Sequence, residues 1–195
     1  MNPTHHEAAA RDTDTRERIL AAGADLFGKK GFNGCGLSEV LQLAGVPKGS
    51  FYNHFSGKEE LLVAICDALM DPMLALAERL DARALAPADH LRELVGDWVA
   101  HVAAHRDHML VFQQERHMVD HGERWRGIRD ARKRFERHVG GVLEALHAEG
   151  VARIDDPRLS LAALLGMVNH TAQWYRPHGR LDPATIADGY VHCLL

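Results

Sequence analysis

Apolar residues recur at every third or fourth position along most of this 195-residue chain, and the strict alternation that marks β-strands is nearly absent. The pattern predicts an all-α fold of about nine helices. Asp14 and Glu17 have the spacing of a capping box, so we expect the first helix to begin at Asp14 and to end near Gly31.

Two short helices are predicted next, at residues 37–44 and 47–54, and the turn between them has the composition of a helix-turn-helix. Ala44 is small enough for two helices to cross closely, and Gly45 permits a left-handed turn. Val46 can close the turn onto the core. The second helix then presents small and polar residues outward, as a helix that enters the major groove of DNA must do.

A longer helix is predicted to follow, because Ser56 and Glu59 form another capping-box pair. Pro72 is expected to kink or split this helix, since proline has no N–H to donate and clashes with the preceding turn. The domain boundary is expected within this helix, because it has no break before Pro72, and we divide the chain at its start. Residues 1–57 are expected to form an N-terminal arm and a DNA-binding domain, and residues 58–195 a ligand-binding and dimerisation domain.

The second domain is predicted to be helical throughout, with no internal repeat and no low-complexity linker. An aspartate followed by a proline, the pattern of a cap and a first-turn proline, opens each of the last two helices. Five helices are expected here, over residues 87–102, 107–119, 123–149, 156–175 and 182–195.

Charge is unevenly distributed along the chain. The formal net charge is −4, yet four of the five lysines lie between residues 29 and 58, a segment that has no arginine and one acid, Glu39. A basic patch on an acidic molecule is typical of a small DNA-binding module joined to another domain. Chance clustering of lysines on a solvated surface is the alternative.

The stretch from Ala44 to Leu61, AGVPKGSFYNHFSGKEEL, closely resembles the recognition-helix signature of TetR-family transcription regulators. The preceding segment, from Arg16 to Leu37, is similar to the first two helices of that family. One difference is visible, because Cys35 and Gly36 stand where the family often has two threonines. Glycine is an acceptable N-cap, so the fold is expected to hold, although no hydroxyl is available there for a phosphate contact.

The resemblance implies a role for each residue of the predicted DNA-binding surface. Tyr52, His54 and Lys58 are expected to contact phosphates. Residues on the same helix are expected to meet bases or the adjacent backbone, and two on the outer side of the preceding helix are further candidates. These residues are Lys48, Gly49, Ser50 and Asn53, followed by Ser38 and Gln42.

The C-terminal stretches 165–171 and 174–181 are similar to the last helices of TetR-type regulators of fatty-acid and steroid catabolism, several of which respond to acyl-CoA thioesters. This resemblance implies a repressor that a small-molecule effector, such as an acyl-CoA, releases from a palindromic operator. The ligand candidates are large aromatics, one polar residue on an apolar helix, and one arginine for phosphates. They are Trp98, Phe112, Trp125, Asn169 and Arg129. Ordinary core packing and a solvated arginine face are the alternatives.

The expected partners are double-stranded DNA, the effector and a second copy of the chain, bound through the last two helices. No apolar run approaches the ~20 residues that a membrane span needs. The three cysteines are widely spaced and suggest no disulfide framework, which favours the cytoplasm. No cofactor is expected, and no catalytic motif is present, so the chain is not predicted to be an enzyme.

A metal-dependent helical enzyme or a metal sensor is the alternative from another class. His101, His105 and His108 recur at i, i+4 and i+7, which places all three on one helix face with spacing compatible with a metal. No cysteine lies near them, and no HExxH motif accompanies them.

Overall fold

The computed structural model describes the backbone of residues 3–150 and 155–195. Within these ranges it is all-α, as the sequence predicts, with ten α-helices and one short 3-10 helix and no strand. The helices are α1 Pro3–Lys30, α2 Leu37–Ala44, α3 Lys48–His54, α4 Lys58–Asp81, α5 Pro87–Ala104, α6 Arg106–Gln114, α7 Arg116–His121, α8 Arg126–Glu149, α9 Pro157–Trp174 and α10 Pro183–His192, with the 3-10 helix η1 at Glu123–Trp125.

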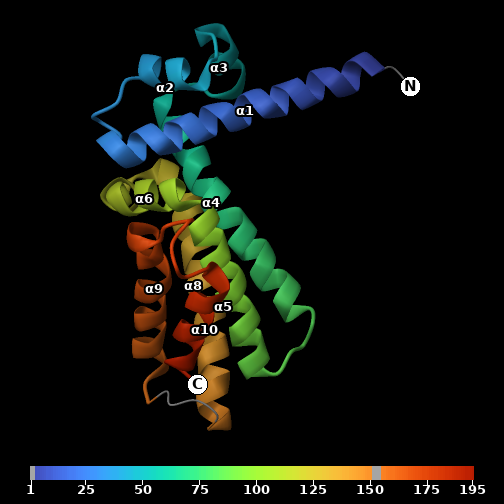
Figure 1. Ribbon diagram of the computed structural model, residues 1–195, viewed down its shortest axis with the longest axis vertical. Coiled ribbons are helices and arrows are strands. Elements are labelled where there is room, and N and C mark those ends of the chain that lie inside the picture. The colour runs from blue at the N-terminus through green and yellow to red at the C-terminus, as the bar shows by residue number, and fades with distance from the viewer. Residues whose placement is uncertain (1–2, 151–154) are drawn as a thin grey trace.

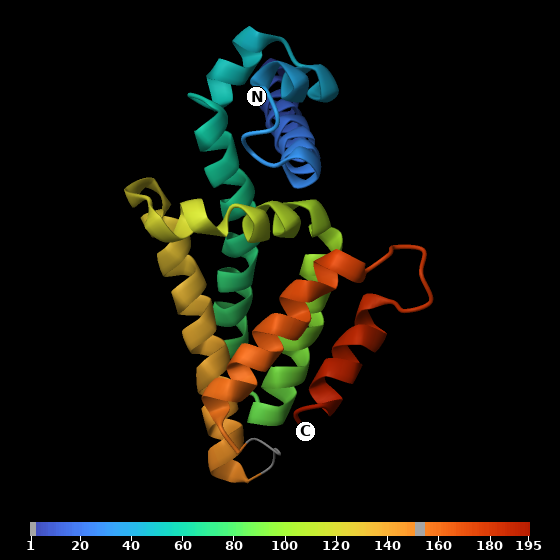
Figure 2. The same cartoon turned by 90° about the vertical axis from the view of Figure 1, so that its left-hand side faces the viewer.

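Helices α1 to α3 form a small head at one end of the molecule, and α4 leads from this head into a larger helical body (Figure 1). In the body, α5, α8, α9 and α10 run roughly along the long axis, and α6 crosses beneath the head (Figure 2). Helix α10 packs on α5, and α8 packs on both α4 and α9.

The head is seated closely on α4. A Cβ at Gly23 of α1 would lie 2.9 Å from Cδ2 of Leu61 and 3.1 Å from Cδ1 of Ile65, so a larger residue here would require these side chains to shift. Leu61 and Ile65 are fully buried, and their side chains belong to one hydrophobic core that continues from the head into the body. The head and the first turns of α4 are therefore packed together through one core.

The first helix begins earlier than predicted. Helix α1 already runs from Pro3, so Asp14 lies inside it and does not cap its N-terminus. The Asp14 carboxylate instead forms an ion pair with Arg18, one turn later, at 3.2 Å. An ion pair between residues i and i+4 stabilises the interior of a helix. Asp14 therefore fits inside α1, although its spacing to Glu17 resembles that of an N-cap.

The start of α4 also differs in detail. Gly57 is the N-cap residue, and the backbone N–H of Ser56 donates to Oε2 of Glu60, not of Glu59, at 2.6 Å. Of the two outcomes predicted at Pro72, a kink or a split, the split is wrong, because α4 continues through this residue to Asp81. In contrast, Asp182 caps α10 as predicted, since its carboxylate accepts from the N–H of Thr185 at 2.7 Å.

Two helices predicted as single elements are divided. The helix expected over residues 107–119 is split at Glu115 into α6 and α7, and the one expected over 123–149 begins with the short 3-10 helix η1. Glu115 turns its carboxylate to the head, where it accepts a hydrogen bond from the N–H of Phe32 at 2.9 Å. The tertiary contact therefore accompanies a break that the periodicity of the sequence does not reveal.

Candidate nucleic-acid interface and effector pocket

The turn between α2 and α3 has the predicted conformation. Gly45 adopts φ 64° and ψ 37°, which is the left-handed region that favours glycine. Ala44 and Val46 on either side are buried. The N-cap of α2 is Gly36, whose N–H donates to Oε1 of Glu39 at 3.1 Å. The two short helices are thus fixed relative to each other by local chemistry.

The outer face of α3 is open to solvent while its inner face is locked in the core. Phe51 and Phe55 are buried, with ring centroids 5.5 Å apart. Tyr52 is 50% exposed, and its ring rests edge-on against Phe51 at 5.4 Å. The predicted contact residues that are exposed on α2 and α3 are Ser38, Gln42, Lys48, Gly49, Tyr52 and Asn53, and Ser50 is half-buried.

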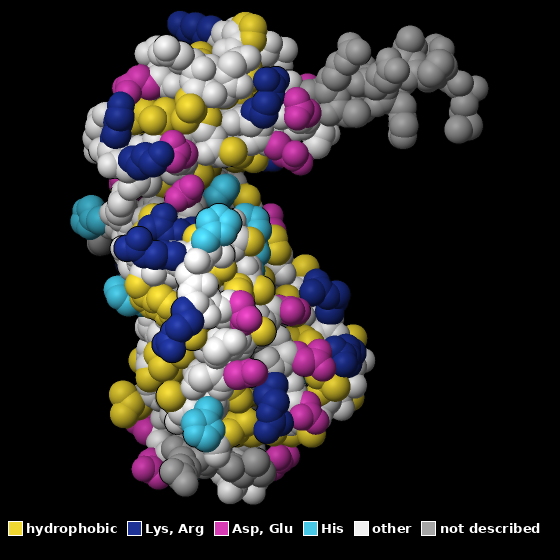
Figure 3. Space-filling model, viewed as in Figure 1, with side chains coloured by type: hydrophobic (Ala, Val, Ile, Leu, Met, Phe, Trp, Pro, Cys, Tyr) yellow, Lys and Arg dark blue, Asp and Glu magenta, His cyan; other side chains and the backbone are white. Residues whose placement is uncertain are grey.

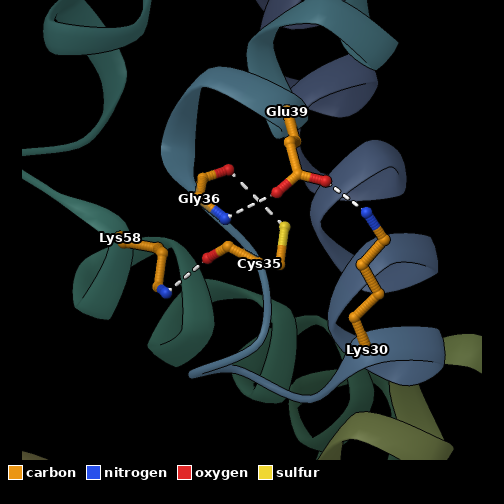
Figure 4. A network of polar contacts seen from close by, with 5 residues as sticks. All are labelled: Lys30, Cys35, Gly36, Glu39 and Lys58. Carbon is orange, nitrogen blue, oxygen red and sulfur yellow. Dashed lines mark hydrogen bonds and ion pairs between the residues drawn. The ribbon is translucent and has the colours of Figure 1, made fainter.

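Lys58 faces inward rather than toward solvent (Figure 4). Its Nζ donates to the carbonyl oxygens of Phe32 at 2.5 Å and of Cys35 at 2.7 Å, and it lies 4.2 Å from the centroid of the Phe32 ring. The cation therefore ties the loop between α1 and α2 to the start of α4. In this conformation its charge is used within the head and is not presented to a phosphate.

His54 is likewise turned into the protein. Its side chain is 7% exposed, and its Nε2 lies 3.4 Å from Oδ1 of Asp12 on α1. The imidazole therefore links the end of α3 to the first helix. Neither this contact nor that of Lys58 follows from the local sequence, because both partners lie more than twenty residues away.

The basic segment offers less free charge than the lysine count suggests. Lys29 pairs with Asp25, Lys30 pairs with Glu39, and Lys58 is held by carbonyl groups. Lys48 makes no ion pair with the side chains that the structure describes. This leaves Lys48, at the first position of α3, as the free lysine of the recognition helix.

Three of the predicted ligand residues line one hollow. Trp98 of α5, Phe112 of α6 and Asn169 of α9 surround it, and α4 and α8 complete its wall. The hollow has a volume of about 50 Å³, which is less than two water molecules occupy in the liquid. Three methionines, Met70, Met73 and Met109, lie along it, and their flexible side chains can repack around a guest.

A larger and more polar hollow of about 480 Å³ adjoins the first. Phe112, Arg132 and Asn169 line both, so the two are continuous at these side chains. Arg116 and His170 lie on the outer one. The inner hollow is mostly apolar, and the outer one carries two arginines, Arg116 and Arg132, of which Arg132 lies 3.5 Å from the carboxylate of Glu136. This lining fits an amphipathic molecule with an anionic head.

Trp125 and Arg129 do not line these hollows. Trp125 belongs to η1 and is buried at the junction of α7 and α8. The guanidinium of Arg129 donates to the carbonyls of Val119 at 2.8 Å and Gly122 at 2.5 Å, so it holds the end of α7. Arg132, three residues later on α8, takes the position at the cavity that the sequence assigned to Arg129.

Most other arginines of this run serve as partners of surface acids. Arg124 pairs with Glu59 at 2.7 Å, and Arg134 pairs with Glu78 at 3.2 Å. Both acids lie on α4, so the arginines bridge α4 to the segment around α8. A solvated arginine face paired with acids was the alternative interpretation of these arginines, and it applies to Arg124 and Arg134.

The histidine face on α5 and α6 is built from hydrogen bonds and ring stacking. Nε2 of His101 lies 2.9 Å from the carbonyl oxygen of Leu69, and among the described residues the ligand atoms of His101, His105 and His108 do not come together as a metal-binding group. His105 is bonded in the same way to the carbonyl of His101 at 3.0 Å. Burial, with a smaller contribution from His105, lowers the pKa of His108 to about 4. Histidines gather on the surface where head and body meet (Figure 3).

Among the helices described, none is long and apolar enough to cross a membrane.

Comparison with known families matches residues 19–65 to the bacterial regulatory proteins of the tetR family. It matches residues 84–195 to the tetracyclin repressor-like C-terminal domain. The chain belongs to the TetR family of transcription regulators, which bind operator DNA through the helix-turn-helix and small effectors through the body.

Full-length relatives agree with this assignment. The chain is 26% identical over 197 residues to the HTH-type transcriptional repressor KstR2 of Rhodococcus jostii, covering 100% of this chain and 96% of the relative. The structure of the ketosteroid transcriptional regulator KstR2 of Mycobacterium tuberculosis superposes with a TM-score of 0.83 at 22% identity, over 92% of this chain and 94% of that one.

A second solved structure is similar and carries ligands. AibR, crystallised in complex with isovaleryl coenzyme A and operator DNA, matches with a TM-score of 0.77 at 26% identity, over 92% of this chain and 97% of that chain. The family assignment supports the reading as a DNA-binding regulator over a metal-dependent enzyme or sensor built on the face formed by His101, His105 and His108.

Proposed function

We propose that the chain is a dimeric, cytoplasmic repressor rather than an enzyme, and that an acyl-CoA thioester or a similar amphipathic anion releases it from a palindromic operator. The observation that carries this proposal is the pair of adjoining hollows, an apolar one against α4 and a more polar one lined by Arg116 and Arg132. Leu69 and Met70 of α4 form part of the inner wall. A guest there would displace the helix that holds the DNA-binding head.

On the DNA side, the proposed contacts come from the exposed residues of α2 and α3. Lys48 supplies a free cation and Tyr52 a half-exposed phenol, while Gly49 has open space where a Cβ would stand. Asn53 adds an amide that can read a base edge. In this proposal Lys58 and His54 position the recognition helix and contact phosphates only after leaving their present partners.

The proposed dimer uses the outward face of α9. Leu159 is 69% exposed and Trp174 is 41% exposed. Ala163, Gly166 and His170 lie between them on the same stripe of the helix, each three or four residues from the next. A largely apolar stripe of this kind, left open on a single chain, suits a helix-helix interface between two copies. Two recognition helices must then stand about 34–36 Å apart to enter successive major grooves.

The domain boundary of this proposal lies between residues 57 and 58. Helix α4 begins at Lys58 and spans the head and the body, so residues 1–57 would move as a unit on its first turns. The effector acts only by binding one arrangement of α4 more tightly than the other. Repression relieved by the ligand follows if the ligand-bound arrangement has the wrong spacing of recognition helices.

The effector class is tested by titrating the protein–operator complex with isovaleryl-CoA, a longer acyl-CoA, the matching free acids and CoA alone. We expect a thioester to release the operator at much lower concentration than its free acid, since the acid lacks the phosphates. Arg132→Gln should weaken the response to the thioester without weakening operator binding. Arg134→Gln, whose side chain pairs with Glu78 on the surface, is the matched control.

Two outcomes would contradict the proposal. Equal potency of thioester and free acid would show that the CoA phosphates do not contribute to binding. An unchanged response of Arg132→Gln would show that the effector does not bind in the hollow lined by Arg132. If none of the acyl compounds releases the operator, the effector belongs to another chemical class, although the DNA-binding role stands.

A further inference from the structure

Three side chains with metal-binding atoms meet where α4 ends and α5 begins, on the side of the body away from the head (Figure 1). Asp81 is the last residue of α4, His90 lies near the start of α5, and His138 lies in the middle of α8. One ligand atom from each lies within 4.8 Å of the others. The set is separate from the face that carries His101 and from the proposed effector pocket.

The spacing of the two imidazoles suits a shared ion. Nε2 of His90 lies 3.1 Å from Nε2 of His138. Two nitrogens bound to one tetrahedral zinc at 2.0–2.1 Å are separated by roughly 3.3 Å, so a shift of a few tenths of an ångström would accommodate the ion. Asp81 has an exposed side chain whose Oδ2 lies 3.4 Å from Nδ1 of His138. This nitrogen is on the opposite edge of the ring from the Nε2 that faces His90, so the exposed carboxylate must turn toward the two Nε2 atoms to become the third ligand.

The surroundings also favour a bound cation over a solvated pair. His90 is only 8% exposed, and the side chain of His138 is 12% exposed, so both rings are held in place by packing. A hollow of about 360 Å³ adjoins them and leaves a path for the ion and for a water as fourth ligand. Arg137 is the cationic residue on this hollow, and its Nε donates to the carbonyl of Lys133.

We propose that Asp81, His90 and His138 form a binding site for one divalent transition-metal ion of the zinc type. Two neutral imidazoles and one carboxylate are a ligand set that zinc takes in proteins, and hard cations such as magnesium prefer oxygen alone. The ion would join the end of α4 to α5 and α8. A bound ion would stabilise the folded body. This role is separate from the regulatory function, and the proposed site does not depend on which effector the protein binds.

The alternative is a metal-free relay in which Asp81, His138 and His90 are hydrogen-bonded in a chain. The two are distinguished by binding experiments on the untagged, full-length protein after dialysis against a chelator. Zn²⁺ is titrated by calorimetry, Co²⁺ is titrated by visible absorption, and the unfolding temperature is measured with and without each ion. The variants are Asp81→Asn and His138→Gln, with Asp89→Asn, an exposed acid on α5, as the matched control.

We expect one Zn²⁺ per chain, a rise in unfolding temperature, and the Co²⁺ spectrum of a four-coordinate site. Asp81→Asn should weaken binding at least about tenfold, His138→Gln should abolish it, and Asp89→Asn should leave it unchanged. Asp81 is exposed, so its variant remains informative even if His138→Gln fails to fold. The proposal is overturned by the absence of stoichiometric binding, or by binding that survives Asp81→Asn at full affinity.

Discussion

The carboxylate of Glu115 accepts a hydrogen bond at 2.9 Å from the backbone N–H of Phe32, although 83 positions separate the two residues. Glu115 lies at the break between α6 and α7, and Phe32 lies in the loop that leads into the helix-turn-helix. A second bond runs beside it, from Nε2 of Gln114 to the carbonyl oxygen of Gly28 at 2.9 Å. Since α6 also lines both hollows proposed for the effector, this pair of bonds connects the helix beside the proposed pocket to the head.

Removal of the Glu115 carboxylate should loosen the head. Glu115→Ala leaves the partly buried N–H of Phe32 without its acceptor, which costs about 1–3 kcal/mol. Hydrogen exchange at the Phe32 amide should therefore accelerate. Glu115→Gln retains an acceptor oxygen and serves as the control, with a smaller change. Equal protection of this amide in wild type and Glu115→Ala would show that the bond does not hold the two domains together.

Substitution of Lys58 should reduce stability more than the loss of a surface lysine does. Lys58→Ala removes two charge-assisted bonds to carbonyl groups and should lower the free energy of unfolding by about 1–3 kcal/mol. Lys48→Ala, which removes an exposed lysine ten residues earlier, should leave it nearly unchanged. Thermal or denaturant unfolding of the two variants is the measurement. Identical stabilities would indicate that Lys58 is free in solution.

Stability should fall as the pH drops below neutrality, because His108 is held neutral by burial. Its pKa in the folded protein is about 4, whereas the ordinary value is 6.5. Between these values the unfolded chain binds a proton that the folded chain does not bind, so protonation favours unfolding. Above pH 6.5 this histidine contributes no pH dependence, and below pH 4 its effect is constant.

The test compares unfolding free energies from pH 7 to pH 4 for His108→Gln and for His178→Gln, an exposed histidine in the loop after α9. His108→Gln should have a shallower pH dependence than wild type, and His178→Gln should match wild type. A His108→Gln profile parallel to that of wild type would contradict the assignment. His101, whose pKa burial also lowers, accounts for part of the remaining slope.

A charge on the outer face of α9 should separate the dimer. Leu159→Glu places a carboxylate in the apolar stripe, and the cost of burying it in an interface favours monomers. Leu181→Glu, which changes an exposed leucine in the loop before α10, is the matched control and should remain dimeric. Light scattering gives the mass directly. A dimeric Leu159→Glu protein would locate the interface elsewhere.

The sequence predicted the parts of the fold that depend on neighbouring residues. The left-handed turn at Gly45 and the cap at Asp182 were predicted correctly because the conformation of glycine and the reach of a carboxylate are local properties. The start of α1 was placed wrongly at Asp14, since an acid inside a helix and an acid at its cap have the same local pattern.

The site could be predicted only in part, because long-range contacts decide which way its side chains face. Lys58 and His54 have the positions of phosphate contacts along the chain, yet distant carbonyl and carboxylate groups bind them in the folded head. On α8, Arg129 and Arg132 lie three residues apart; the carbonyl groups of Val119 and Gly122 bind the first, and the second lines the cavity. The periodicity of the sequence predicts which face of a helix is buried, but it does not predict which side chain on that face reaches the cavity.

Recognition of a palindromic operator by the exposed face of α3, within a dimer, can be measured by selecting bound DNA from a random library and sequencing it. Wild-type protein should enrich an inverted repeat whose half-site centres lie about 10 base pairs, or a multiple of this, apart. Lys48→Ala and Tyr52→Ala should lose this enrichment, and Lys133→Ala, an exposed lysine of α8, should retain it. No enriched repeat, or a repeat that both α3 variants still select, would contradict the account.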